Sequence, residues 1–98
     1  MRRHGEYKMP GGKLVVADVV VTAGVLTDVA ISGDFFLEPD AALATMDASL
    51  RGLPANATDD ALAAAVTAGL PADTRMFGIS AEAVAVAVRR AIDAGAVA

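Results

Sequence analysis

The chain has 98 residues, a length that predicts one domain over residues 1–98. It has no cysteine, which excludes disulfide scaffolds, thiolate metal sites and cysteine nucleophiles. The formal net charge of −4 argues against nucleic acid as a partner. No apolar run approaches the roughly 20 residues that cross a bilayer, so no membrane partner is expected.

The charge is distributed unevenly along the chain. Residues 1–13 hold four basic residues and one acid, whereas residues 14–98 hold four arginines and eleven acids. We expect residues 1–7 to be a flexible leader that can reach an anionic partner, with a short edge strand over residues 6–8 as the alternative. No apolar segment follows the two N-terminal arginines, so the leader is not a secretory signal and the expected compartment is the cytoplasm.

Hydrophobic residues make up 55% of the chain, and the mean hydropathy is +0.51. A chain this short buries only about 60–65% of the surface that its unfolded form exposes. The apolar side chains are therefore expected to outnumber the interior sites and to leave an apolar surface patch for a partner. Scattered exposed valines are the simpler alternative.

The first half of the chain predicts strands. Residues 14–22 are dense in β-branched side chains, Ala23-Gly24 is a tight-turn signal, and residues 25–31 alternate again. We expect a β-hairpin with one apolar face, a bend at Gly33 and a third short strand over residues 34–37. The apolar face is expected to hold Val15, Ala17, Val19 and Val21 from the first strand and Val25, Thr27, Val29 and Ile31 from the second.

The hydrophobic period changes to that of a helix after residue 38. Pro39 suits a first helical turn, with Glu38 and Asp40 at the positive end of the helix, and Gly52 suits the position just past its C-terminus. The inward-facing residues of this helix are expected to be Leu43, Met46 and Leu50.

Two further helices are expected. Thr58 is the predicted N-cap of the second helix, which Gly69 ends, and residues 71–78 are expected to be a loop. Ser80 is the predicted N-cap of the last helix, which Gly95 ends. A hydrophobic staple between Ile79 and Val84 supports this start, and the small residues expected to let the helix approach the sheet are Ala81 and Ala85.

Strands precede helices along the chain, and no internal repeat is present. This order predicts an α+β fold rather than alternating βαβ units. The predicted architecture is a two-layer sandwich, in which an antiparallel sheet from the N-terminal β-hairpin plus a short strand packs against about three C-terminal helices.

The segment Gly11-Gly12-Lys13 is the first candidate for a functional role. A phosphate-binding loop needs a longer glycine-spaced cradle, a Ser or Thr after the lysine and then a helix, whereas Leu14 and a strand follow here. One interpretation is a turn with a solvated Lys13. The other is a close backbone approach to an anion or a partner, with Lys13 supplying charge.

The segment Gly33-Asp34-Phe35-Phe36 is the second candidate. Asp34 suits a hydrogen bond to its own turn. In an extended chain Phe35 and Phe36 point to opposite faces, so one should lie in the core while the other meets a second layer, a helix or a partner. The pair therefore indicates an interface.

The sequence predicts no catalytic and no metal-binding residues. Asp59 and Asp60 are explained by the positive end of a helix, and the serines have no histidine partner beyond the poorly placed His4. Within one chain, a single histidine cannot build a histidine cluster.

The two candidate segments share their order and spacing with a known family. The chain resembles the C-terminal accessory domain of lipoate–protein ligases through Lys8-Met9-Pro10-Gly11-Gly12-Lys13-Leu14-Val15, the β-hairpin, Gly33-Asp34-Phe35-Phe36 and Pro39. Leu50-Arg51-Gly52 and Gly78-Ile79-Ser80 extend the resemblance to about residues 5–94. In that family the domain is fused to a catalytic domain or occurs as a separate small subunit, and this chain resembles the separate form.

The resemblance implies a non-catalytic accessory subunit. Such a subunit docks on a separate catalytic subunit and enables ATP-dependent adenylation of lipoate, before the lipoyl group passes to a lysine of a carrier protein. No cofactor is then expected on this chain alone, whereas ATP, Mg²⁺ and lipoate are expected in the heterodimeric complex, with the lipoyl carrier domain as an indirect partner. The expected ligand or partner contacts are Lys8, Gly11, Gly12, Lys13, Gly33, Asp34, Phe35 and Phe36.

Two other functions remain open from the residues alone. The apolar surplus equally suits a non-enzymatic interaction module or homodimer unrelated to lipoylation. A helix-turn-helix DNA binder built from the last two helices is disfavoured by the acidic body and the valine-rich hairpin.

Overall fold

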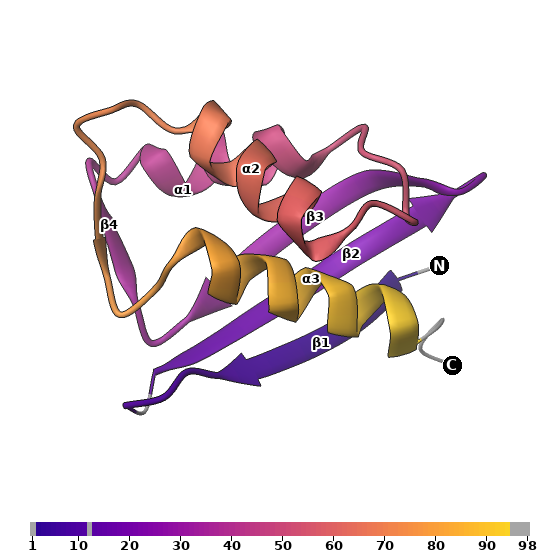
Figure 1. Cartoon of the computed structure of the whole chain (residues 1–98), viewed down its shortest axis with the longest axis horizontal. Helices are drawn as coiled ribbons and strands as arrows, with labels where there is room; N and C mark the ends of the chain where they lie inside the picture. The colour runs from indigo at the N-terminus through magenta and orange to yellow at the C-terminus, as the bar shows by residue number, and fades with distance from the viewer. Residues whose placement is uncertain (1, 12, 95–98) are drawn as a thin grey trace.

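The computed structural model of the chain describes residues 2–11 and 13–94. It contains a three-stranded antiparallel sheet of order β1-β2-β3, a separate two-stranded sheet of β4 and β5, and three helices. The helices cover one face of the larger sheet, as Figure 1 shows, so the predicted α+β class is confirmed. Two predicted features, Gly12 of the glycine turn and Gly95 at the end of the last helix, lie outside the described residues.

The central hairpin is formed by β2 (Leu14–Thr22) and β3 (Val25–Gly33). The two turn residues, Ala23 and Gly24, have φ angles of 52° and 78°. Positive φ at both positions is typical of the type I′ turn that joins right-twisted strands. The predicted hairpin is therefore confirmed.

One face of β3 differs from the prediction. The pairing register shifts between Val20 and Val21, so the alternation of β3 changes phase near its start. As a result Leu26 is buried with Val29 and Ile31, whereas the side chain of Val25 is 36% exposed. The expectation that Val25 and Thr27 face the core is wrong, because strict alternation cannot anticipate a bulge.

The N-terminal residues form a strand rather than a flexible leader. β1 (Arg2–Lys8) pairs antiparallel with β2 over its whole length, from Arg2 opposite Val20 to Lys8 opposite Leu14. The prediction of a leader over residues 1–7 is therefore wrong for residues 2–7. The polar sequence of β1 gives little signal for a strand. This strand is held in place by β2 and by a helix rather than by apolar side chains of its own.

That helix is α3 (Ala81–Ala94), which packs across β1 and β2. Its closest approach to the sheet is at Gly5, the buried residue of β1. A Cβ atom at this position would lie 2.6 Å from the carbonyl oxygen of Ala87 and would also collide with the backbone of Ala91. The sequence predicted a close approach through Ala81 and Ala85, which are buried, but the tightest contact lies further along the helix.

Polar contacts at both ends of β1 strengthen the junction between this strand and α3. The Nη1 group of Arg3 donates to the Ile92 carbonyl at 2.8 Å, and Nη1 of Arg90 donates to the Glu6 carbonyl at 3.1 Å. The Arg90 guanidinium also lies 5.0 Å from the ring centroid of Tyr7, a cation–π distance. The N-terminal strand and the C-terminal helix are therefore joined by side-chain contacts as well as by backbone packing.

The remaining helices form the rest of the covering layer. α1 (Ala42–Leu50) packs against β3, and α2 (Asp59–Gly69) bridges α1 and α3. α1 begins three residues after Pro39 and has no acid in its first turn, so the predicted roles of Pro39, Glu38 and Asp40 in that turn are wrong. The Pro39 carbonyl instead accepts from the N–H group of Ala42 at 2.9 Å.

The starts of the other two helices confirm the sequence prediction. The hydroxyl of Thr58 accepts from the Ala61 N–H group and that of Ser80 accepts from the Ala83 N–H group, each at 3.1 Å. Each cap satisfies a backbone donor that the first helical turn leaves without a partner. The predicted staple residues Ile79 and Val84 are both buried, as are Met46 and Leu50 of the predicted inward-facing residues of α1. Leu43, the third of those residues, is partly buried against the core.

The short strand predicted over residues 34–37 is displaced and has an unexpected partner. β4 (Phe36–Glu38) does not join the hairpin but pairs with β5 (Arg75–Phe77), inside the segment 71–78 that was predicted as a loop. A three-residue strand has too few positions to show an alternation, so only its pairing reveals it.

α1 also protects the outer edge of the larger sheet. The carboxylate of Asp47 in α1 accepts from the backbone N–H group of Ile31 in the edge strand β3, at 3.1 Å. Partial burial raises the pKa of Asp47, and the hydrogen bond from Ile31 opposes that shift. An edge donor that would otherwise be open to another chain is thus occupied within the fold.

We predict that Gly5→Ala strongly destabilises the protein. The added methyl group meets backbone atoms of α3, which cannot rotate away, so the cost should reach about 3 kcal/mol, the upper part of the usual overpacking range. Urea unfolding followed by circular dichroism measures this free energy. Lys8→Ala, on an exposed position of the same strand, is the matched control and should change it by less than about 0.5 kcal/mol. Equal stability of the two variants would show that α3 does not press on β1 at this point.

Candidate interaction site

The glycine turn closes the hairpin between β1 and β2. Lys8 opposite Leu14 is the last pair of this ladder, and the Met9 N–H group donates to the Lys13 carbonyl at 2.7 Å. Gly11 has a φ of 97°, which a residue with a side chain rarely adopts. Lys8, Gly11 and Lys13 are all exposed at this end of the sheet, while Gly12 lies outside the described residues.

The second candidate segment meets the first at Leu14. Gly33 pairs with Val15, has a φ of 144°, and leaves no room for a Cβ atom against the Leu14 carbonyl oxygen. The same carbonyl accepts a hydrogen bond from the Asp34 N–H group at 3.1 Å. The two segments singled out in the sequence are therefore brought together at one end of the sheet.

The two phenylalanines of this segment have different environments. Phe35 is partly buried and packs against the core, whereas Phe36 is 57% exposed. Phe36 stacks on Phe77 of β5, with ring centroids 4.6 Å apart and an angle of 15° between the ring planes. Phe77 is itself 40% exposed. The prediction that the two rings face different surroundings is confirmed, and the partner of the exposed ring within the chain is Phe77.

Lys13 links the glycine turn to this aromatic pair. A Cβ atom at Gly78 would lie 2.8 Å from Cγ of Lys13 and 3.3 Å from its Cδ, so the aliphatic part of the lysine lies over Gly78. Gly78 directly follows Phe77, and it has a φ of 76°. We call the surface formed by Lys13, Phe36, Phe77 and Gly78 the aromatic end of the molecule.

Phe77 was missed in the sequence analysis, because it lies in a segment without periodicity. The motif Gly78-Ile79-Ser80 in the family resemblance was the available signal that this segment matters. The aromatic end combines exposed apolar area with a cationic side chain, an arrangement suited to contacts with another molecule. In Figure 1, β4 lies at the left and the turn between β1 and β2 lies below it, both at the end of the molecule away from the marked termini.

Residues 2–11 and 13–94 form no pocket, and they hold no group of three or more histidine, cysteine, aspartate or glutamate side chains arranged to bind a metal ion. No helix in these residues is long and apolar enough to cross a membrane.

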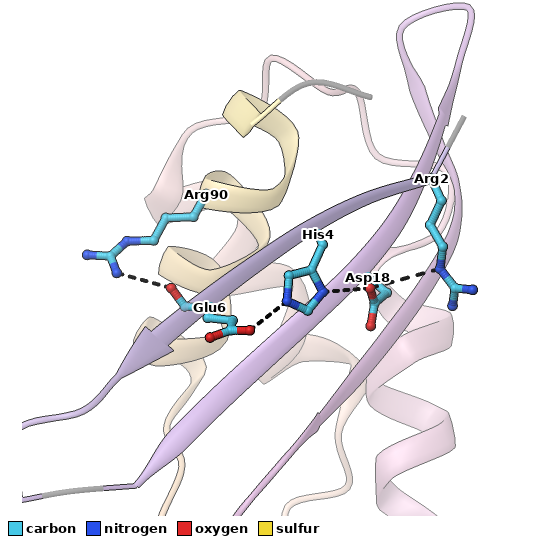
Figure 2. A network of polar contacts seen from close by, with 5 residues as sticks. All are labelled: Arg2, His4, Glu6, Asp18 and Arg90. Atoms are coloured by element: carbon cyan, nitrogen blue, oxygen red, sulfur yellow. Dashed lines mark hydrogen bonds and ion pairs between the residues drawn. The ribbon is translucent and has the colours of Figure 1, made fainter. Parts of the chain in front are cut away.

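A network of polar side chains lies on the face of the sheet away from the helices. His4 contacts Asp18 through Nδ1 at 2.8 Å and Glu6 through Nε2 at 2.7 Å, and Arg2 Nε lies 3.9 Å from the same Asp18 carboxylate. Figure 2 shows His4 between the two acids, with Arg90 reaching the Glu6 carbonyl from α3. The hydrogen bond to Glu6, followed by that to Asp18, raises the pKa of His4.

Comparison with known proteins adds one finding to this geometry. No protein-family model matches the chain, and no curated protein matches its sequence. Among solved structures, it matches a chain from an archaeal lipoylation system of Thermoplasma acidophilum, which comprises a bipartite lipoate protein ligase and its E2 lipoyl domain. The match, to the small subunit of that ligase, has a TM-score of 0.71 and 21% identity over 91% of this chain and 96% of the other.

This chain shares the fold of that small subunit. The resemblance drawn from the two sequence segments is therefore confirmed at the level of the fold, over nearly the whole of both chains. The strand, hairpin and helix order described above is thus common to both proteins, despite the low identity.

We predict that the ring of His4 titrates above pH 6.5, the value of a free histidine. Because protonated His4 is favoured in the folded state, its stabilising contribution is present below pH 6.5 and is lost as the pH rises through the higher pKa of the folded protein. His4 is the single histidine, so NMR can follow its ring protons directly. Glu6→Gln should lower the midpoint more than Asp18→Asn, and a wild-type midpoint at or below 6.5 would contradict the network.

Proposed function

We propose that this chain is the accessory subunit of a two-part lipoate–protein ligase. The observation that carries the proposal is the fold shared with the small subunit of the archaeal bipartite ligase, at a TM-score of 0.71 over almost all of both chains. The resemblance of the segments around Lys13 and Phe36 supports it independently, because it was drawn from residues rather than from the fold. Those segments also lie together at the aromatic end.

In this proposal the chain docks on a separate catalytic subunit and forms a heterodimer. ATP, Mg²⁺ and lipoate are assigned to the catalytic subunit, as the family resemblance implies. The lipoyl carrier domain is an indirect partner that receives the lipoyl group on a lysine. We place this complex in the cytoplasm.

The physical contribution of the accessory subunit is to close the site during adenylation. In that step a carboxylate oxygen of lipoate attacks the α-phosphorus of ATP, pyrophosphate leaves, and lipoyl-AMP forms. Negative charge develops on the phosphate oxygens, and groups that stabilise it act more strongly where water is excluded. A small domain packed over the site would exclude water, and its exposed Lys13 would add a positive charge at the edge.

Reconstitution with the catalytic subunit of the same organism tests the proposal. Size-exclusion chromatography should show a complex of one copy of each chain, and lipoyl-AMP should accumulate faster when this chain is present. Formation of a homodimer that ignores the catalytic subunit, with adenylation unchanged, would instead favour a non-enzymatic interaction module.

We predict that Lys13→Ala slows ATP–pyrophosphate exchange by the reconstituted pair. A loss of roughly tenfold to a hundredfold is expected, since single groups that stabilise transition-state charge commonly contribute on that order or more. Arg51→Ala is the matched control, because it also removes one positive charge but lies after α1, far from the turn between β1 and β2. An equal rate for Lys13→Ala and Arg51→Ala would remove Lys13 from the reaction.

A further inference from the structure

The two edges of the three-stranded sheet differ in how far their backbone groups are occupied. At the β3 edge, the Leu26 N–H group donates to the Leu53 carbonyl at 2.9 Å, and the Leu26 carbonyl accepts from the Gly52 N–H group at 2.7 Å. Further along the same strand, the Asp47 carboxylate accepts from the Ile31 N–H group at 3.1 Å. The chain therefore closes much of this edge with its own residues.

The pairing of β1 leaves every second residue directed away from the sheet. In an antiparallel ladder, residues that exchange hydrogen bonds with the partner strand alternate with residues whose backbone groups point outward. The Met9 N–H group donates to the Lys13 carbonyl, and the pairing of β1 with β2 continues from there without a shift. The residues whose backbone groups face the outer edge are therefore Arg2, His4, Glu6 and Lys8.

This outer edge is open within the part of the chain that the structure describes. Among its backbone groups, only the Glu6 carbonyl has a partner, which is Nη1 of Arg90 at 3.1 Å. All four outward-facing residues are exposed, and no other labelled element lies beyond β1 in Figure 1. Backbone donors and acceptors at an open edge can pair with another extended chain.

The side chains along this edge are mainly basic. β1 carries Arg2, Arg3 and Lys8 against one acid, Glu6, which is already bound by His4. The rest of the chain has the opposite balance, with eleven acids and four arginines over residues 14–98. Side chains of opposite charge on neighbouring strands attract each other. The edge therefore suits an added strand that carries negative charge.

Charge also disfavours a second copy of β1 as the added strand. In a two-fold antiparallel pair, residue i of one copy faces residue j of the other and the reverse. Pairing over the full strand places Arg2 opposite Lys8. The two shorter registers that keep five residues paired place His4 opposite His4, or Glu6 opposite Glu6. His4 is charged here, because both of its ring nitrogens contact carboxylate oxygens. Each register thus opposes like charges.

We propose that the outer edge of β1 binds an extended acidic segment of another protein, which joins the sheet as a fourth strand. Backbone hydrogen bonds to the outward-facing residues supply affinity in this mode of recognition, and alternate side chains supply specificity. Acids on one face of the segment lie beside Arg2 and Lys8. Acids on the helix side lie beside Arg3 and Arg90, and an N–H group of the segment takes the place of the Arg90 guanidinium at the Glu6 carbonyl.

An NMR titration with designed peptides tests the edge. The probe is a blocked peptide of alternating glutamate and valine with the seven-residue length of β1. It should shift the amide signals of β1 and bind at least about tenfold more tightly than the corresponding lysine–valine peptide, which the basic side chains repel. A glutamate–proline peptide carries the same charge but lacks half of the N–H groups, so it should bind more weakly than the glutamate–valine peptide.

Two variants separate pairing of the backbone from attraction between charges. His4→Pro removes an outward N–H group while leaving the ladder with β2 intact, and it should weaken binding by roughly fivefold, the usual contribution of one hydrogen bond. Its matched control is His4→Gln, which removes the same ring but keeps the N–H group. Arg90→Glu leaves the backbone of β1 unaltered and should weaken binding by charge reversal, so the edge is tested even if the proline variant fails to fold.

The outcomes support or overturn the site directly. Shifts confined to β1, with His4→Pro weaker than His4→Gln or with Arg90→Glu weaker than the wild type, support strand addition. Absence of shifts with the glutamate–valine peptide overturns it. Equal binding of the glutamate–proline peptide overturns it as well, because the attraction then depends on charge alone. Shifts of the β1 amides that grow with the concentration of the chain itself would assign the edge to a homodimer and also overturn the proposal.

Discussion

The fold depends on the contact between the backbone of β1 and the backbone of α3 at Gly5. This contact replaces the side-chain layer that normally separates a helix from a sheet, since even one methyl group at Gly5 would collide with Ala87 and Ala91. Dispersion forces fall steeply with distance, so such a close approach gains attraction along the whole interface. It explains how a strand with the sequence Arg-Arg-His-Gly-Glu-Tyr-Lys is held in a sheet without a large apolar side chain at its centre.

The position of the aromatic end follows from the same constraint. When β1 is held against α3, its last residue pairs with the first residue of β2, and this pairing sets the turn that carries Lys13. Two further glycines complete the arrangement. Gly33 allows Asp34 to bond to the Leu14 carbonyl, and Gly78 gives the Lys13 side chain a surface on which to lie. The site is thus assembled from backbone contacts that side chains would block.

Sequences of low identity can share this fold, because the close contacts at Gly5, Gly33 and Gly78 constrain few positions. At 21% identity to the archaeal small subunit, few side chains are shared, yet the arrangement of strands and helices is preserved. A fold that relies on small residues at close contacts and on alternating apolar positions can accept many substitutions elsewhere. A fold does not by itself fix a function, so the role proposed for this chain has to be tested on the surface that the fold presents.

Several elements of the structure could be predicted from local patterns in the sequence. The β-branched hairpin, its two-residue turn, and the caps at Thr58 and Ser80 were all predictable, because each depends on residues within a few positions of one another. The α+β class followed from the order of the elements. The sequence also singled out the two glycine segments, and the structure brings them together at the Leu14 carbonyl, while their role as contacts stays a prediction.

The remaining features of the fold depend on contacts between residues that are far apart in the sequence. Only the tertiary structure made a strand of the whole of Arg2–Lys8, because this strand is held by pairing with β2 and by contacts with residues of α3 more than eighty positions away. Only the pairing of β4 with β5 placed Phe77 on Phe36, and only the shifted register of β3 turned Leu26 inward and Val25 outward. The physical reason is the same in each case: the free energy of these contacts depends on spatial neighbours that no local pattern of residues can specify.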